Sequence, residues 1–443
     1  MPNIIELFAG VGGFRVGLES RANEALGDNY YNVIWSNQWE PATITQHAFR
    51  TYERRYGEGS CVNEDIAEVI KNPARIPDAE MLCGGFPCQD YSVARTLRQA
   101  AGIEGKKGVL WWSIYNLVRD KAEQNHAPTV LFLENVDRLV QSPASQRGRD
   151  FAIILESLSE LGYNVEWRII NAAEYGMPQR RRRTYILAYR HDSPLCLGME
   201  NATRWIFEDG VFAHAFPVQS YEGAPLVGQR LMNKGDNDLA DLSEHFNAEH
   251  PDRRVFQNAG IMVNGVFYTY RTEADYGTRD GETFTTLGDI VRNTPREYVT
   301  EDFFIPEEGP VMESWRHQKG AKKEKRVNRS TGFEYMYSEG GMPFPDPLDK
   351  PSRTIITGEG GRTPSRFKHV IEDINDPVVI TNPDGTTRHR YRRLVPIELE
   401  QLDMFPVNHT AGESAEKRAF FMGNALVCGI VERVGIELAH REW

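Results

Sequence analysis

Two residues in this sequence have the type and the setting that nucleophilic and acid–base chemistry require. Cys88 comes directly after Pro87, in a glycine-containing loop that follows an apolar segment ending at Cys83. Near several backbone amides, the Cys88 thiol could act as a nucleophile, whereas Cys83 fits the commoner role of a small buried side chain. Glu134 ends the apolar segment Thr129–Leu133. Partial desolvation there would raise its pKa and let it donate a proton, although a helix cap or a salt bridge would also explain a glutamate.

Four consecutive arginines form a second candidate group. Arg180–Arg183 follows Gln179 at the start of another expected strand. Alternation along a strand places Gln179, Arg181 and Arg183 on one side, and Arg180 and Arg182 on the other. One set could face a site and the other could face solvent.

A glycine turn near the N-terminus could bring the backbone close to a ligand. Phe8-Ala9-Gly10-Val11-Gly12-Gly13-Phe14-Arg15 lies between an expected strand and a helix. It is not a GxGxxG dinucleotide fingerprint, because Arg15 occupies the last glycine position. A turn with a purely structural role is about as common.

The next two expected strands end in residues that suit a nucleoside. Gln38-Trp39-Glu40 could stack the indole of Trp39 on an adenine and bind hydroxyls through Gln38 or Glu40, or it could be a core tryptophan beside a surface glutamate. Asp65-Ile66 stands where a third strand would end and suits an exocyclic amine and a ring face.

The elements that would position these residues alternate between strand and helix patterns. This alternation predicts an α/β fold with a doubly wound, Rossmann-like sheet and a second, smaller, irregular domain. We expect domain bounds of 1–192 plus 414–443, and 193–413. The segments behind this prediction are Asn3–Phe8, Asn32–Ser36, Ala42–Tyr56, Glu80–Cys83, Val109–Ala122, Thr129–Leu133, Phe151–Leu161, Val165–Ile170, Thr184–Ala188 and the helical tail Ser414–His440.

Composition narrows the class of protein. The chain has 443 residues, of which 40% are hydrophobic and 26% are charged. Its five cysteines are scattered, and this argues against a disulfide framework or a zinc ribbon. No apolar run approaches the ~18 residues of a membrane helix, and a basic, apolar leader is missing, so we expect a cytoplasmic protein with no membrane association and no metal.

Charge is unevenly distributed. The net charge is −12, and Asp236–Asp252 has six acids and no Lys or Arg. Basic residues gather in Arg316–Arg329, with seven against one acid, in Arg180–Arg183 and in Arg388–Arg393. This pattern indicates a bipolar molecule with one side that faces phosphates.

Taken in order, these pieces closely resemble the C5-cytosine DNA methyltransferase family of the prokaryotic type. The resemblance covers about the first 190 and the last 50 residues, and the unmatched middle is where the family carries its variable target-recognition region. The segments that carry the resemblance are Phe8-Ala9-Gly10-Val11-Gly12-Gly13, Gly85-Phe86-Pro87-Cys88-Gln89, Glu134-Asn135-Val136, Gln179 with Arg181 and Arg183, and Gly423-Asn424-Ala425.

The resemblance implies roles for individual residues. Cys88 would be the nucleophile, Glu134 the acid, and Arg181 and Arg183 substrate-orienting partners. The family usually has an acid just before the tryptophan, where this chain has Gln38, so either Gln38 or Glu40 binds the ribose. An S-adenosyl-L-methionine pocket would be lined by Phe8, Gly10, Gly12, Gly13, Phe14, Gln38, Trp39, Glu40, Asp65, Ile66, Pro87, Leu110, Asn424 and Ala425. Substrate contacts would come from Gln89, Ser92, Asn135 and Gln179.

The implied chemistry explains the residue types. Thiolate attack at C6 of cytosine creates carbanion character at C5, protonation at N3 offsets the charge, and C5 can then accept a methyl group. The base must be flipped out of double-stranded DNA for this to happen. The resemblance also implies a monomer, with a restriction system or another phage-defence system as the setting.

Three alternative functions have weaker support in the sequence. A C5-cytosine methyltransferase of tRNA would share the pocket, but that branch carries a Cys-Phe-Thr element, and Cys196 here is followed by Leu197. A non-catalytic DNA-binding member would be expected to lack Cys88 or Glu134. A nicotinamide oxidoreductase is disfavoured by Arg15 and leaves Cys88 unexplained.

Overall fold

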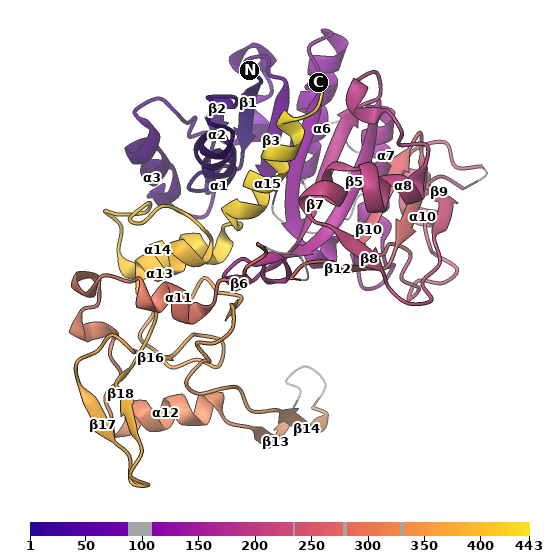
Figure 1. Cartoon of the computed structure of the whole chain (residues 1–443). Helices are drawn as coiled ribbons and strands as arrows, with labels where there is room; N and C mark the ends of the chain where they lie inside the picture. The colour runs from indigo at the N-terminus through magenta and orange to yellow at the C-terminus, as the bar shows by residue number, and fades with distance from the viewer. Residues whose placement is uncertain (87–108, 234, 278–280, 328–331) are drawn as a thin grey trace. The chain divides into compact units, whose positions relative to one another are not determined.

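The computed structural model describes residues 1–86, 109–233, 235–277, 281–327 and 332–443 (Figure 1). Two compact units divide the chain. The first comprises Met1–Tyr175, Arg182–Glu282 and Cys428–Trp443, and the second comprises Gly176–Arg181 and Thr283–Val427. These units have other bounds than the functional domains expected above, chiefly because residues 193–282 fold with the first unit.

A nine-stranded mixed sheet forms the centre of the first unit, and it confirms the predicted α/β class. Its order is β2-β1-β3-β4-β7-β5-β10-β11-β9. The first four strands in this order are parallel, and every pair from β4·β7 onward is antiparallel. The strands are β1 (Asn3–Leu7), β2 (Asn32–Asn37), β3 (Met81–Gly85), β4 (Val130–Val136), β5 (Tyr163–Asn171), β7 (Arg182–Arg190), β9 (Val227–Arg230), β10 (Ala259–Val263) and β11 (Val266–Tyr270).

Helices cover both faces of this sheet, which explains why its strands are nearly continuous apolar runs. On one face, α6 and α7 pack on the strands through Trp111, Ile114 and Phe151. On the other face, α15 packs against η1, where Gly17 is so close to Val431 that an added Cβ would lie 2.5 Å from it. The helices of this layer are η1 (Val16–Ala22), α6 (Val109–Glu123), α7 (Arg149–Glu160) and α15 (Cys428–Ala439).

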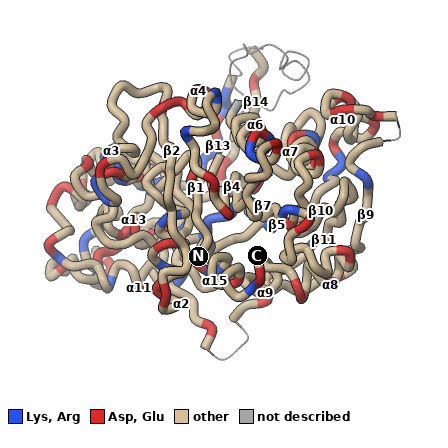
Figure 2. The backbone as a smooth tube through the Cα atoms, turned by 90° about the horizontal axis from the view of Figure 1, so that it is seen from above, with Lys and Arg blue, Asp and Glu red and all other residues tan. Residues whose placement is uncertain are grey.

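The remaining elements of the first unit are short. They include the acidic α10, whose Asp241 and Glu244 belong to the acidic segment 236–252 (Figure 2). They are α1 (Gly13–Arg15), α2 (Asn23–Leu26), α3 (His47–Tyr56), α4 (Ile66–Val69), η2 (Pro73–Arg75), η3 (Asp137–Gln141), η4 (Ala172–Tyr175), η5 (Pro194–Cys196), α8 (Ala202–Arg204), η6 (Trp205–Asp209), α9 (Val211–Ala215), β8 (Val218–Ser220), α10 (Leu239–His245) and β12 (Thr272–Ala274).

The second unit consists of short helices and two-stranded ribbons, in keeping with the irregular pattern expected from the sequence. Its apolar cores are small, and one of them is built around Trp315 and Val370. Its elements are β6 (Gln179–Arg180), α11 (Leu287–Arg292), η7 (Arg296–Tyr298), η8 (Glu301–Phe303), α12 (Pro310–Lys319), β13 (Lys322–Val327), β14 (Glu334–Glu339), β15 (Ser352–Arg353), β16 (Ile371–Glu372), β17 (Val379–Thr381), β18 (Thr387–His389), β19 (Tyr391–Arg392), α13 (Pro396–Leu402) and α14 (Ala415–Asn424).

The interpretation of Arg388–Arg393 as a phosphate-facing cluster is wrong. Arg392 is fully buried and pairs with Glu398 at 2.7 Å and with Asp373 at 3.0 Å. Arg390 lies 2.6 Å from a carboxylate oxygen of Asp376. These arginines are paired with carboxylates 6 to 19 residues away in the sequence, and a buried cation needs such partners.

The basic run Arg316–Arg329 is only partly available to phosphates. Lys319 is buried and its ammonium lies 3.5 Å from Asp346. The strand β13 of the same run is exposed, and it carries Lys323 and Lys325. Part of the run therefore stabilises the second unit, and part of it stays on the surface.

No single helix within the described parts of the chain is long and apolar enough to cross a membrane. Among the described helices, only α14 and α15 taken together, with the bend between them, have the length and apolar composition of a membrane-spanning segment.

Candidate active site

The glycine turn after β1 has the tight backbone conformation that the sequence predicted. Gly10 and Gly12 have positive φ angles of 56° and 88°. An added Cβ on Gly12 would lie 2.9 Å from the ring of Tyr56, whereas an added Cβ on Gly10 would meet nothing within 4 Å. Gly12 is therefore required for packing, and Gly10 leaves open space beside the turn.

The end of β2 is tied directly to this turn. The Gly10 N–H donates to Oε1 of Gln38 at 2.7 Å, and the side chain of Gln38 is buried. Trp39 is 39% exposed. The Glu40 carboxylate accepts a long hydrogen bond of 3.4 Å from Thr43. Of the two ribose-binding alternatives, Gln38 thus has its carbonyl oxygen engaged by the turn, while Glu40 keeps its carboxylate near the surface.

The strand expected before Asp65 is not formed. Val62 makes only an isolated bridge with Asn37, and Asp65 instead caps α4 by accepting the Ala67 N–H at 2.9 Å. An aspartate that can bond the amide two residues ahead favours a helix start over a continuing strand. The side chain of Ile66 is buried in the main core.

The predicted acid lies at the carboxyl end of β4. Glu134 pairs with Arg183 of β7, with Oε1 of Glu134 at 3.0 Å from Nε of Arg183. Both side chains are mostly buried, at 13% and 19% exposed. Gly85 of the neighbouring strand β3 leaves room for the acid, because an added Cβ there would lie 3.1 Å from Oε2 of Glu134. This ion pair fixes the direction of the carboxyl group at the sheet edge.

Asn135 has a structural role beside the acid. Its amide nitrogen donates to the carbonyl of Phe86 at 2.8 Å, and its oxygen accepts from the Val136 N–H. It therefore holds the residue that precedes the Pro87-Cys88 segment. Pro87, Cys88, Gln89 and Ser92 themselves lie outside the described residues.

The predicted alternation in Gln179–Arg183 is confirmed by burial. Gln179 and Arg181 are buried, and Arg180 and Arg182 are exposed. Gln179 and Arg181 belong to the second unit, however, and Arg183 belongs to the first. In the second unit, Gln179 donates to Asp403 at 2.7 Å, and Arg181 donates to the carbonyl of Gly423 at 2.9 Å.

The other predicted cofactor residues occupy varied positions. Phe14 is buried and packs edge-to-face on Phe132, with ring centroids 5.1 Å apart. Leu110 is half-buried against the main core. Asn424 ends α14 in the second unit and donates to the carbonyl of Phe420, and Ala425 follows it as the C-cap. Their assignment to a cofactor pocket stays a prediction.

Sequence reasoning missed Glu6. This carboxyl group is fully buried in β1 beneath the turn, accepts a hydrogen bond from the Tyr52 hydroxyl at 2.9 Å, and lies 3.4 Å from the Arg15 N–H. Burial raises the pKa of Glu6 to about 7, against the lowering effect of Tyr52 and Arg15. A glutamate inside the apolar run Ile4-Ile5-Glu6-Leu7 was the available signal.

Glu6→Gln should flatten the pH dependence of stability. The pKa of Glu6 is about 7 in the folded chain and near 4.5 without burial, so the folded state retains a proton that the unfolded chain releases between these values. The free energy of unfolding therefore falls by about 3 kcal/mol as pH rises through this window. Urea unfolding between pH 4.5 and pH 8 should show this fall in the wild type and in an exposed-site control, Glu24→Gln, but not in Glu6→Gln. Equal falls in all three proteins would contradict the assignment.

The chain belongs to the C-5 cytosine-specific DNA methylase family, whose model matches residues 2–440. It is an enzyme, a C5-cytosine DNA methyltransferase, from a family that uses S-adenosylmethionine.

Two relatives illustrate this membership. The chain is 42% identical over 437 residues to Type II methyltransferase M.Sau3AI of Staphylococcus aureus, covering 98% of this chain and 95% of the relative. It is 35% identical over 188 residues to Type II methyltransferase M.HhaI of Haemophilus parahaemolyticus, covering 42% of this chain and 49% of the relative.

Solved structures agree at the level of the fold. The S. pombe Dnmt2 methyltransferase has a TM-score of 0.53 at 15% identity, with 99% of this chain and 97% of that chain covered. The Entamoeba histolytica methyltransferase EhMeth has a TM-score of 0.51 at 14% identity, with 99% of each chain covered. The fold predicted from the sequence is thereby confirmed.

Proposed function

We propose that this chain methylates C5 of a flipped-out cytosine in a specific duplex sequence through covalent attack of Cys88 at C6. The observation that carries the proposal is the Glu134–Arg183 ion pair at the carboxyl end of β4. The neighbouring strand β3 ends at Gly85 and leads into Pro87-Cys88. In α/β sheets, ligands bind at this edge, so the acid and the thiol come from adjacent strand ends.

The residues around the glycine turn fit S-adenosyl-L-methionine. The open space beside Gly10 accommodates a ligand, the exposed face of Trp39 suits an adenine, and Glu40 suits ribose hydroxyls. When bound, this cofactor supplies an electrophilic methyl group. The role of the chain is to hold it with its methyl group toward the edge where Glu134 lies.

The chain's own residues prepare the cytosine for methylation. The Cys88 thiolate forms a bond to C6, and the electron pair of the C5–C6 double bond moves toward C5 and N3. Glu134, which must first take up a proton because its carboxylate is paired with Arg183, gives that proton to N3 and so offsets the developing negative charge, while Arg183 keeps the carboxyl group directed at the base. C5 then bonds the electrophilic methyl group. A base, which the sequence does not identify, removes the C5 proton, the electron pair of that C–H bond restores the C5–C6 double bond, the C6–S bond breaks to release the Cys88 thiolate, and the proton on N3 returns to Glu134.

Double-stranded DNA is the partner, and the base must leave the stack to reach Cys88, at a cost of a few kcal/mol. We assign catalysis to residues 1–192 and 414–443 and target recognition to residues within 193–413. The enzyme acts as a monomer and protects host DNA beside a companion restriction nuclease or another phage-defence protein.

Bisulfite sequencing of plasmid DNA from cells that express the chain tests this function. We expect protected cytosines confined to one short sequence, because recognition by duplex-reading side chains is sequence-specific. A plasmid without protected cytosines, from cells in which the folded chain is abundant, would overturn the proposal.

Glu40→Ala should raise the KM for S-adenosylmethionine by about tenfold to a hundredfold, the value of a hydrogen bond to a charged group, and should change kcat little. The Gln38 alternative is tested with a cofactor analogue that lacks a ribose hydroxyl. Wild type and Gln38→Ala should both bind this analogue more weakly than they bind the cofactor. Glu40→Ala should bind the analogue and the cofactor with equal affinity. If Gln38→Ala is the variant that fails to distinguish them, Gln38 binds the ribose instead.

A further inference from the structure

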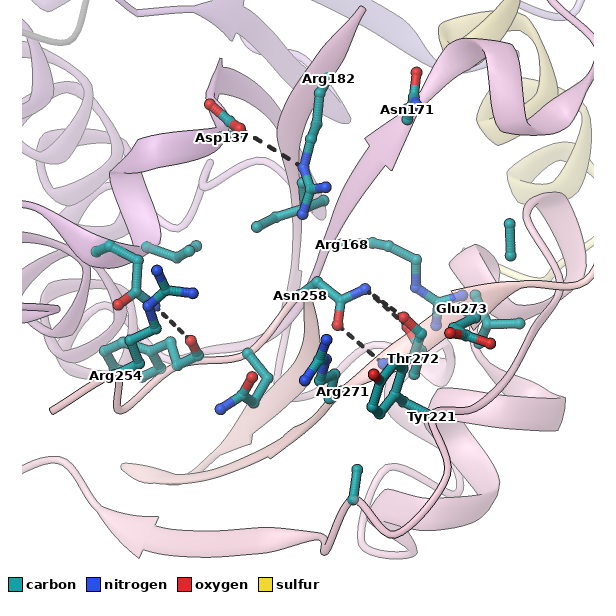
Figure 3. Close-up of a pocket in the computed structure, with 18 of the residues that line it drawn as sticks. Asp137, Arg168, Asn171, Arg182, Tyr221, Arg254, Asn258, Arg271, Thr272 and Glu273 are labelled. Atoms are coloured by element: carbon teal, nitrogen blue, oxygen red, sulfur yellow. Dashed lines mark hydrogen bonds and ion pairs between the residues drawn. The ribbon is translucent and has the colours of Figure 1, made fainter. Parts of the chain in front are cut away.

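A cavity of about 1200 Å³ lies in the first unit, at one edge of the nine-stranded sheet (Figure 3). The strand register defines this edge. Val136 pairs with Arg183, Asn171 pairs with Arg182, and Ala259 pairs with Arg168, so the end of β4, the start of β7, the end of β5 and the start of β10 all meet there. The cavity is therefore on the same sheet edge as the Glu134–Arg183 pair. Its lining begins beside that pair, at Asp137 and Arg182, and continues past β10.

Six arginines line this cavity. Figure 3 shows Arg182, Arg254 and Arg271 reaching toward its middle from three separate segments. All three are exposed. Arg271 stacks on the ring of Tyr221 at 3.6 Å, and Arg182 lies 3.6 Å from the carboxylate of Asp137. The full set is Arg138, Arg147, Arg168, Arg182, Arg254 and Arg271.

Arg168 adds a buried donor to the cavity wall. Its side chain is almost fully buried, and its terminal nitrogens donate to the carbonyls of Phe216 and Ile206. Its Nε–H has no hydrogen-bond partner among the described residues. A buried N–H without a partner costs free energy, so this guanidinium is held in place by its carbonyl partners rather than by all of its donors.

The cavity floor is rigid and its charge is asymmetric. Asn258 and Thr272 bind each other through three hydrogen bonds of 2.9 to 3.1 Å, which fix the strand ends. Four acids also line the cavity, Asp137, Glu174, Glu222 and Glu273. Asp137 is paired with Arg182, and the other three are exposed, so phosphates would lie nearest to the six arginines and away from these carboxylates.

We propose that this cavity binds backbone phosphates of the substrate DNA, to one side of the flipped cytosine. The inference rests on the proposed function, since it places the target base beside Glu134. The lining runs from Asp137, just after β4, to Arg271, just after β11, and neighbouring strands are about 4.8 Å apart, so the cavity extends from beside β4 to about 19 Å from it. DNA rises about 3.4 Å per nucleotide along one strand, so the contacted phosphates lie within about six nucleotides of the target.

The test compares Arg254→Gln/Arg271→Gln with a matched control, Arg119→Gln/Arg204→Gln, whose two arginines are exposed and outside the cavity. The probe is a fluorescent duplex with the bisulfite-identified site at its centre or, if no site is found, a duplex of mixed sequence. At about 0.1 M salt, the cavity variant should bind about tenfold to a hundredfold more weakly, and its slope of log K against log salt should be shallower by about 1.8, the value for two lost phosphate contacts. Its circular dichroism spectrum should match that of the control, which establishes that the variant is folded.

A second measurement locates the contact without relying on a variant. Uncharged methylphosphonates placed one at a time within about six nucleotides of the target should, at one or more positions, weaken binding by the wild type but not by the cavity variant. Equal affinity and equal salt slope for the two double variants would overturn the inference. Binding of inorganic phosphate or a mononucleotide in the cavity with no change in the affinity for DNA would also overturn it. Absence of methyl transfer by the wild type would instead overturn the proposed function, and the binding measurements would still decide about the cavity.

Discussion

Cys88→Ser should abolish methyl transfer to DNA and leave DNA affinity close to that of the wild type. A serine hydroxyl is similar in size but is scarcely ionised near neutral pH, so it cannot add to C6 at a useful rate. Binding depends mainly on phosphate contacts, which this substitution does not touch. Transfer of a labelled methyl group and an equilibrium binding assay with the same duplex would measure the two effects separately.

Trapping on DNA that contains 5-fluorocytosine assigns the nucleophile directly. The fluorine cannot leave as a proton would, so the covalent adduct should persist, and peptide mass spectrometry should find it on Cys88. The nearby thiol is a poor competitor, because burial raises the pKa of Cys83 far above its usual range and keeps it protonated. An adduct on Cys83 or no adduct from an active enzyme would refute the assignment.

Glu134→Gln should slow the chemical step by two or more orders of magnitude, the usual scale for a positioned proton donor. The substitution keeps the size of the side chain but removes the acidic proton and the charge opposite Arg183. Single-turnover methylation should fall while the affinity for DNA and cofactor stays near that of the wild type. Glu123→Gln on α6, a glutamate whose side chain is 70% exposed, is the control and should react normally.

An effect on binding rather than on the rate would assign a different role to Glu134. If Glu134→Gln raised the Kd for DNA and left the single-turnover rate intact, the carboxylate would serve only to position Arg183. A variant with a normal rate and normal binding would remove Glu134 from the site altogether.

The first half of the sheet could be predicted because its signals are local. β1, β4 and β7 are apolar runs whose ends differ from the predicted ones by only a few residues, and the glycine turn has the expected form. The strand expected before Asp65 failed for a local reason too. The capping preference of that aspartate starts a helix, and only a single bridge to Asn37 remains.

The features that the sequence did not predict depend mainly on contacts formed only in the folded chain. Three strands between 227 and 270 extend the central sheet, and one of them, β10, pairs with β5 across a long separation that no local pattern reports. Arg392 was misread for another reason: its partners Glu398 and Asp373 are only 6 and 19 residues away, but its burial depends on how the second unit folds around them. Glu6 was visible as an anomaly, but its neighbour Tyr52 was not.

The extended sheet has a consequence for exchanging specificity between relatives. A chimera cut at residue 192 would remove β9, β10 and β11 and leave β5 as a bare edge, with unpaired N–H and C=O groups open to aggregation. A junction near residue 282, where the first compact unit gives way to the second, keeps every strand of the central sheet paired. Transplants of recognition segments into this scaffold should therefore begin about ninety residues later than the change in sequence pattern suggests.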